Sequence, residues 1–229
     1  MTRDPRFDIL FEPVRIGPVV AKNRFYQTPH CNGMGWTQPE ALAALRGVKA
    51  EGGWAVVCTE EVEIHPTSDC EPFHEGRLWD DDDIPALARM VEAVHAHDAL
   101  AAIEIMHHGA SCANWGTREA PLAPSHRPII YYAPVQARAM DKSDIRALRR
   151  WHRDAAIRAR RAGFDIVYVY ATQDLSIAMH SCRPARTSAL TNMAAAWKTG
   201  SGCCAKSSRI RKTRLAIAAP SQCVSVWTN

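Results

Sequence analysis

Asn23 to Cys31, read as NRFYQTPHC, is the stretch of this sequence that decides the fold. The aromatic residues Phe25 and Tyr26 suit a buried strand, and Pro29 marks the strand end because proline cannot continue a hydrogen-bonded ladder. Cys31 then falls on the loop directly after the strand. A single cysteine is often only a buried core residue, but loops at the carboxyl ends of parallel strands carry the chemistry of α/β proteins. The motif therefore marks Cys31 as a candidate functional residue.

Strand and helix patterns alternate on both sides of this motif through the first 180 residues. Gly17 and Pro18 predict the turn of an N-terminal hairpin. Apolar residues at helical spacing predict helices, and the carboxylates of residues 81–83 are expected to cap the helix that starts at Ile84. The predicted elements are a hairpin over 9–25, strands over 25–29, 54–64, 100–106 and 165–170, helices over 39–51, 84–97 and 143–162, and a long loop before the last helix.

The fold class that these elements predict is α/β. Strands that are apolar along their whole length, each followed by a helix, indicate a parallel sheet. No G-x-G-x-x-G turn follows any strand, which argues against a Rossmann nucleotide site. Four such units fit the N-terminal half of a (β/α)8 TIM barrel, of which a complete example needs about 250 residues.

Charge and cysteine are unevenly distributed along the 229 residues. The chain carries 28 Lys and Arg and 24 Asp and Glu, but residues 181–229 contain eight of the basic residues and none of the acidic ones. We therefore predict a domain over 1–180 and an irregular tail over 181–229. The tail's basic positions Arg209, Arg211, Lys212 and Arg214 have no interleaved aromatic residues, so no nucleic-acid partner is predicted.

Several classes of protein and site are disfavoured. No run of about 18 apolar residues predicts a membrane span, and the first residues are too charged for a signal peptide. A cytoplasmic protein with reduced thiols is the expectation. His107 and His108 follow the third strand, but no third ligand stands at metal spacing, so no metal site is predicted. The arginines of the 146–161 segment are interpreted as a solvated outer helix face.

Three separated segments carry a family resemblance: DPRFDILFEPVRIGPVVAKNRFYQTPHC at 4–31, VKAEGGWAVVCTEEVEI at 48–64 and AGFDIVYVY at 162–170. Together they resemble the Old Yellow Enzyme family of FMN oxidoreductases, in particular its branch of trimethylamine, dimethylamine and histamine dehydrogenases. The resemblance covers about residues 4 to 180. It independently implies the TIM barrel and an FMN cofactor.

The resemblance also implies cofactor-binding residues. Thr28, Pro29 and His30 correspond to the end of the first strand, whose backbone lies against the flavin ring in the family. Cys31 matches the cysteine that bonds covalently to the flavin in the amine dehydrogenases. Glu104 corresponds to the residue that faces the flavin pyrimidine, where a carboxylate can accept the ring N3 hydrogen.

Two further positions match catalytic residues of the family and one matches a substrate contact. Tyr170 corresponds to a tyrosine at the end of the fourth strand, placed to bond substrate or tune proton transfer. Gln173 stands where the amine dehydrogenases usually carry a histidine, and an amide cannot shuttle a proton at neutral pH. Glu61 falls where trimethylamine dehydrogenase has an aromatic residue that receives a methylated ammonium. An acidic residue would attract a cationic amine by charge instead.

By resemblance, the function is oxidation of a small amine C–N unit by FMN. Full-length relatives are expected to be homo-oligomers and to pass electrons to a 4Fe-4S cluster on a later part of the chain; the sequence does not identify the electron acceptor. Two alternatives remain: an NAD(P)H-dependent ene-reductase on the same barrel, which the Pro-His-Cys motif disfavours, and a non-catalytic half-barrel or basic-tailed binding protein.

The tail has a possible origin in a shifted reading frame. In the family, a signature containing D-E-Y-G-G-S-L-E-N-R follows the fourth strand, and residues 190–200 can be encoded so that a shifted frame reads that signature. We interpret 181–229 as frameshifted, and we expect the first 180 residues to be a truncated, inactive domain that holds little or no flavin. Its fourth strand would be an open edge with exposed apolar faces, which predicts poor solubility.

Overall fold

The computed structural model describes residues 4–129, 133–182, 213–215 and 223–226. Most of the predicted tail therefore lies outside the described residues, including the frameshift signature at 190–200 and the basic positions Arg209, Arg211 and Lys212. The helix α4 (Ile177–Cys182) crosses the predicted domain boundary at residue 180.

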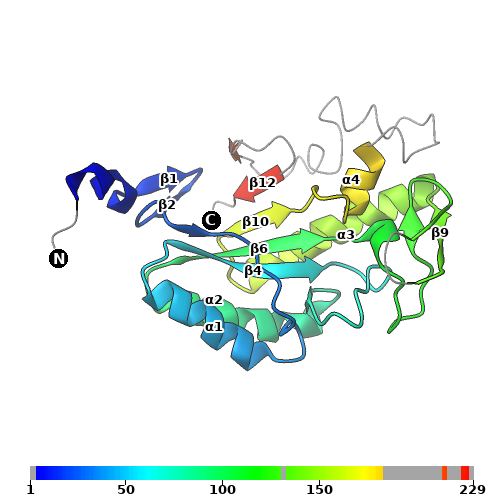
Figure 1. Ribbon diagram of the computed structural model, residues 1–229, viewed down its shortest axis with the longest axis horizontal. Coiled ribbons are helices and arrows are strands. Elements are labelled where there is room, and N and C mark those ends of the chain that lie inside the picture. The colour runs from blue at the N-terminus through cyan, green and yellow to red at the C-terminus, as the bar shows by residue number, and fades with distance from the viewer. Residues whose placement is uncertain (1–3, 130–132, 183–212, 216–222, 227–229) are drawn as a thin grey trace.

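A parallel sheet forms the centre of the molecule, as the sequence predicts (Figure 1). Its strands pair in the order β3, β4, β6, β10, and neighbouring strands in this series are parallel. The strand β5 pairs with the end of β4, while β12 pairs antiparallel with β10 and with β11. The fourth strand is thus not the open edge that the sequence predicts, because β12 occupies its free backbone groups. The bounds are β3 Tyr26–Gln27, β4 Val56–Glu63, β5 Gly76–Arg77, β6 Leu100–Met106, β10 Ile166–Val169, β11 Thr213–Leu215 and β12 Cys223–Val226.

Three helices pack on one face of this sheet (Figure 1). The helix α1 begins at proline, whose missing N–H suits a first turn, and α3 begins with a capping box at Asp141 and Asp144. Alternate strand residues such as Ile103 and Ile105 join buried helix side chains in one apolar cluster. The arginines of α3 lie mostly on its exposed side, which confirms the predicted solvated face. No described helix is long and apolar enough to cross a membrane. The bounds are α1 Pro39–Glu51, α2 Ile84–His95 and α3 Lys142–Arg161.

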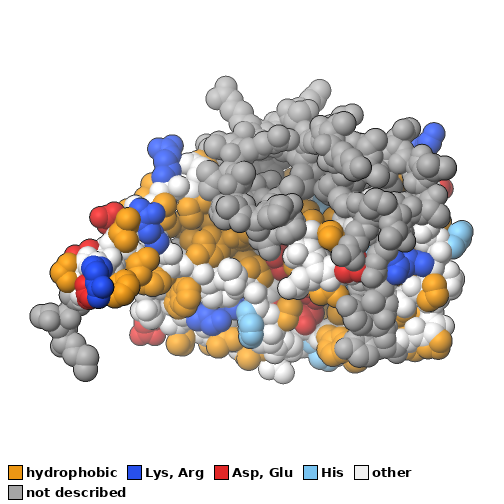
Figure 2. All heavy atoms as spheres, turned by 45° about the horizontal axis from the view of Figure 1, so that its top comes forward, with side chains coloured by type: hydrophobic (Ala, Val, Ile, Leu, Met, Phe, Trp, Pro, Cys, Tyr) orange, Lys and Arg blue, Asp and Glu red, His pale blue; other side chains and the backbone are white. Residues whose placement is uncertain are grey.

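The opposite face of the sheet meets the N-terminal hairpin at the amino ends of the strands (Figure 1). The hairpin is shorter than the predicted 9–25, because residues 5–11 form the 3-10 helix η1 (Pro5–Phe11) instead. Apolar side chains gather on the surface over this region, as Figure 2 shows. The most exposed are Phe7, Ile9 and Val20. The hairpin strands are β1 Val14–Ile16 and β2 Val19–Ala21.

The carboxyl ends of the strands carry the longer connections. The predicted plain loop between β6 and α3 contains a short helix and a three-stranded sheet. The helix α4 is attached to the end of β6, since Ile177 N–H donates to the His107 carbonyl at 2.8 Å. These elements are η3 Gly109–Ser111, β7 Leu122–Ala123, β8 Arg127–Pro128 and β9 Gln136–Ala139.

The acidic run before α2 acts differently from the sequence prediction. Asp80 and Asp83 form a capping box around the one-turn helix η2 (Asp81–Asp83), while the first turn of α2 itself receives no side-chain cap. The Asp83 carboxylate is buried, accepts the Trp79 N–H at 2.8 Å and pairs with Arg77 at 2.8 Å. The prediction failed because the half-buried Arg77 and the Trp79 N–H occupy the Asp83 carboxylate, which therefore does not cap α2.

Candidate functional site

A cavity of about 560 Å³ opens at the carboxyl ends of the parallel strands. Every site residue predicted from the sequence lines it except His30, so the structure brings together groups that are more than 140 positions apart in the chain. The predicted residues on its wall are Thr28, Pro29, Cys31, Glu61, Glu104, Tyr170 and Gln173.

The backbone of the Pro-His-Cys segment is held from behind by a buried arginine. Arg46 of α1 is 0% exposed, and its Nη2 donates to the His30 carbonyl at 2.6 Å. Its Nη1 donates to Gln27 Oε1 at 3.3 Å, and the same oxygen accepts the Cys58 N–H at 3.1 Å. The sequence reasoning missed Arg46; the available signal was a cation on the side of the helix that carries Leu42 and Ala43.

An irregularity in β4 places two carboxylates side by side. The pairing of β4 with β6 shifts register between Cys58 and Glu61, and Glu61 then lies opposite Glu104. Thr59 fills the irregular step, since its hydroxyl accepts the Glu104 N–H at 3.1 Å. Bulges of this kind re-aim side chains beside functional sites. Burial, reinforced by the negative charge of Glu61, raises the pKa of Glu104 to about 8.

The carboxyl groups of Glu61 and Glu75 lie beside Cys31, while the cation of Arg46 lies behind its loop. Cys31 is exposed as a residue, but the cavity wall shields its sulfur from part of the solvent, and this desolvation, with the negative charge of Glu61, raises the pKa of the thiol. Burial also raises the pKa of the nearby Glu75 to about 8. Thiolate character at Cys31 would therefore need a positively charged occupant of the cavity.

Tyr170 and Gln173, which also line the cavity, are hydrogen-bonded to each other. The phenol donates to Gln173 Oε1 at 2.8 Å, which leaves the phenol oxygen free to accept a hydrogen bond. Gln173 holds a left-handed backbone with φ of 52°. Burial and the charge of Glu104 raise the pKa of Tyr170, so the phenol stays protonated at neutral pH.

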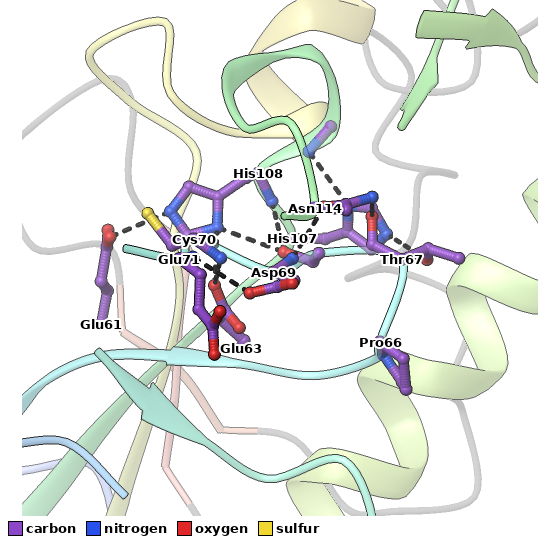
Figure 3. Close-up of polar contacts among 12 residues, drawn as sticks. Glu61, Glu63, Pro66, Thr67, Asp69, Cys70, Glu71, His107, His108 and Asn114 are labelled. Atoms are coloured by element: carbon purple, nitrogen blue, oxygen red, sulfur yellow. Dashed lines mark hydrogen bonds and ion pairs between the residues drawn. The ribbon is translucent and has the colours of Figure 1, made fainter. Parts of the chain in front are cut away.

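A second polar group, which the sequence reasoning missed, lies beside these residues (Figure 3). His108 Nε2 contacts Glu61 Oε1 at 2.9 Å, and His108 Nδ1 lies 3.5 Å from Glu63 Oε1. Cys70 stands next to them, and hydrogen bonding with Cys112, together with His108, lowers the pKa of its thiol to about 5. No sequence spacing signals this group, because its members come from β4, from the loop after β4 and from the loop after β6.

Asp69 ties two of these loops together. Its Oδ2 accepts the N–H groups of Gly116 and Thr117, each at 2.8 Å, and its Oδ1 accepts the Glu71 N–H at 3.0 Å. Its own N–H donates to Asn114 Oδ1 at 2.9 Å. The loops after β4 and β6 therefore form one hydrogen-bonded wall of the cavity.

Residues 9–175 match the NADH:flavin oxidoreductase / NADH oxidase family. The chain belongs to this family. Its members use FMN, and its dehydrogenases are oxidoreductases. The resemblance found in the sequence is thus confirmed, as is its implication of the barrel fold.

Individual relatives of this chain include several amine enzymes. Dimethylamine dehydrogenase of Hyphomicrobium sp. (strain x) is 41% identical over 74% of this chain and 24% of its own length. Histamine dehydrogenase of Rhizobium sp. 4-9 is 53% identical with a TM-score of 0.78, over 80% of this chain and 28% of that one. The amine oxidase HisD of Pseudomonas geniculata N1, which acts on 6-hydroxypseudooxynicotine, is 49% identical with a TM-score of 0.82, over 83% and 29%.

The names of more distant relatives do not mention amines. NADPH dehydrogenase of Listeria welshimeri is 30% identical over 71% of this chain and 48% of its own length. The Old Yellow Enzyme homologue of Zymomonas mobilis, at 22% identity and a TM-score of 0.69, shares the fold. The chain thus spans about a quarter to a half of the length of these relatives.

The described residues of the cavity wall fit the ring of FMN better than its phosphate. Glu104 offers buried carboxyl oxygens to a ring N–H, and the Cys31 sulfur lines the same cavity. None of the described residues that line the cavity is Lys or Arg, whereas phosphate binding favours such cations. His108 is the wall's single described side chain that can carry a positive charge, and it already faces Glu61.

Proposed function

We propose that this chain supplies the ring-facing wall of an FMN-dependent amine dehydrogenase. The observation that carries the proposal is the convergence of Cys31, Glu61, Glu104 and Tyr170 on one cavity whose described lining holds several carboxyl groups and no Lys or Arg. An acid-rich, partly buried cavity favours a cationic ligand, and an alkylammonium is such a ligand. The relatives at 41–53% identity act on amines.

Each wall residue has a role that follows from its position. The Glu61 carboxylate would pair with the ammonium group, and the Tyr170 oxygen would accept one of its N–H hydrogens. Glu104 would accept the ring N3 hydrogen, while Thr28 and Pro29 would bound the ring edge. FMN would supply an acceptor for a hydride from the carbon next to nitrogen, after which water hydrolyses the resulting imine.

Cys31 would hold the ring covalently. In the balanced reaction a C–S bond replaces a ring C–H bond, and two electrons and two protons pass to an oxidant such as dioxygen. We propose that the 229-residue chain by itself retains little flavin, because its described cavity lining offers no cation for the phosphate.

Acid precipitation tests the attachment. The purified chain is incubated with FMN in air, denatured in acid and washed, and the flavin absorbance that stays with the polypeptide is measured. We expect a small fraction of labelled chain that disappears in Cys31→Ser. Cys58→Ser is the matched control, because Cys58 is fully buried and absent from the cavity wall. Equal labelling of wild type and Cys31→Ser, or no labelling of wild type, contradicts covalent attachment through Cys31.

The substrate class is tested separately by anaerobic reduction of bound flavin. Bleaching of the flavin absorbance by dimethylamine or histamine, and its loss in Glu61→Gln, is the expected result. The rival ene-reductase activity predicts bleaching by NADPH instead, in line with the 30% identical NADPH dehydrogenase. Bleaching by neither class would favour a non-catalytic protein.

A further inference from the structure

Glu61, Cys70 and His108 place one carboxylate oxygen, one sulfur and one imidazole nitrogen within 4.8 Å of one another. Figure 3 shows the three side chains close to one another, and all three line the cavity. We infer that they form a binding site for a thiophilic divalent transition metal such as Zn²⁺, with a fourth position open to the cavity. This site shares the cavity wall and Glu61 with the contacts of the proposed function, but Cys70 and His108 are not among those contacts.

The ligand types select the metal. A thiolate, an imidazole and a carboxylate together suit Zn²⁺ or Co²⁺, whereas Mg²⁺ and Ca²⁺ prefer all-oxygen sites. Three protein ligands and one open position are the arrangement of catalytic rather than structural zinc. With Cys70 and Glu61 as anions and His108 neutral, a divalent ion would leave the group without net charge.

The distance between His108 and Glu61 needs little adjustment. His108 Nε2 and Glu61 Oε1 are 2.9 Å apart, as a hydrogen bond requires. Tetrahedral zinc with bonds of about 2.0–2.2 Å separates such atoms by about 3.4 Å. An opening of about half an ångström would therefore let the ion replace the shared proton. Binding forms three coordinate bonds and releases the displaced protons to solvent.

The residues behind the ligands already hold them in place (Figure 3). Glu63, which is 5% exposed, accepts the Cys70 N–H at 2.5 Å and lies 3.5 Å from His108 Nδ1. Ser68 Oγ accepts the His108 N–H at 2.8 Å and contacts Nδ1 at 3.2 Å. A carboxylate behind the distal nitrogen of a histidine is the usual support of a zinc ligand. One buried residue thus orients both Cys70 and His108.

A neighbouring group offers an internal alternative. Cys31, Glu61 and Glu75 also bring their ligand atoms within 4.8 Å of one another. Cys31 is exposed, and in this group no side chain is an imidazole. The Cys70 group is favoured because it is more deeply buried and is supported by Glu63 and Ser68.

Cobalt binding to the purified full-length chain tests the inference. The chain is stripped with a chelator, dialysed and titrated with Co²⁺ under reducing, anaerobic conditions. The difference spectrum between loaded and unloaded protein removes any flavin contribution. We expect a thiolate-to-cobalt charge-transfer band that saturates at one ion per chain and disappears when Zn²⁺ is added in excess, but not when Mg²⁺ is added.

Matched variants then assign the ligands. Cys70→Ser should abolish the band, and Glu63→Gln should weaken Co²⁺ binding about 10–100-fold, as loss of an outer support does. Cys31→Ser should retain both the band and the affinity. No band in the wild type overturns the inference, as does a band that Cys31→Ser removes and Cys70→Ser leaves. Glu61→Gln is a second ligand variant, and it should also lose affinity for Co²⁺. Circular dichroism of each variant checks that it is folded.

Discussion

Replacement of Arg46 by methionine would test whether a buried cation holds the cavity wall in place. Methionine fills much of the same volume but removes the guanidinium. The bond from Nη2 to the His30 carbonyl is short, at 2.6 Å, and hydrogen bonds from charged donors contribute about 1.5–3 kcal/mol. The bond from Nη1 to Gln27 Oε1, at 3.3 Å, is longer and contributes less.

An opposing effect reduces the loss. Burial lowers the pKa of Arg46, and among the described residues its Nε has no hydrogen-bond partner. Removing a buried cation recovers part of its desolvation cost. We therefore expect a net loss of about 2 kcal/mol in the free energy of unfolding. With a urea dependence of about 2 kcal/mol per molar, the unfolding midpoint should fall by about 1 M.

Two measurements check this expectation. Urea unfolding followed by circular dichroism gives the midpoint, and alkylation of Cys31 under native conditions reports whether its loop has loosened. Arg89→Met is the matched control, since Arg89 is half exposed and pairs with the exposed Glu40 on the surface; such pairs contribute about 0–1 kcal/mol. If Arg46→Met unfolds at the same midpoint as Arg89→Met and alkylates at the wild-type rate, the proposed support of the wall is wrong.

Further substitutions at four positions have definite expected outcomes. Gly109→Ala should destabilise the fold by about 2–4 kcal/mol, because its φ is +62° and the new Cβ would lie 2.9 Å from a side-chain atom of α4. Gly33→Ala is the comparison: its φ is +69°, but no atom lies within 4 Å of the new Cβ. It should lower the free energy of unfolding in urea by only about 1 kcal/mol. Asp69→Ala should cost about 3–5 kcal/mol by the same assay, since three backbone N–H groups lose a buried carboxylate, and Asp69→Asn should cost less. The carboxylate of Asp165, 2.8 Å away, raises the pKa of His95. The ion pair of His95 and Asp165 therefore stabilises the fold below about pH 6.5, and this stabilisation is lost as pH rises through the folded-state pKa. A difference in melting temperature between wild type and His95→Gln that does not shrink from about pH 5.5 to 8.5 would refute this.

The parallel sheet and its helices could be predicted from the sequence because local patterns report them. The strand predicted over 100–106 and the helix predicted over 39–51 have the observed bounds, since apolar periodicity and flanking glycine or proline act within a few residues. The three-stranded sheet between β6 and α3 could not be predicted. Its strands are two to four residues long and are stabilised by partners elsewhere in the loop.

The residues of the candidate site likewise fall into those that the sequence predicts and those that it does not. Cys31 and Tyr170 could be found because the family resemblance marks them, and because one lies just after a predicted strand and the other ends one; the ends of parallel strands meet at one edge. His108 and Cys70 could not be assigned a shared role, since 38 positions separate them and their contact depends on how two loops fold. The register shift that aligns Glu61 with Glu104 was equally hidden, because a bulge changes which residues face each other without a distinct sequence mark.

The charge of the cavity connects the two proposals. Glu61 lies within reach of Cys31 on one side and of His108 on the other, so it belongs to both groups of potential ligands. Two cations that share one carboxylate would repel each other at a separation of a few ångströms, and the low dielectric of a partly buried wall strengthens that repulsion. An ammonium group at Glu61 and a divalent ion on Cys70 and His108 would therefore weaken each other unless Glu75 or Glu104 takes over one of them. Burial raises the pKa of both of these carboxyls to about 8, and a cation would return them to the charged form. The acid-rich wall can thus neutralise more than one positive charge, but the two cations compete for the carboxylate of Glu61.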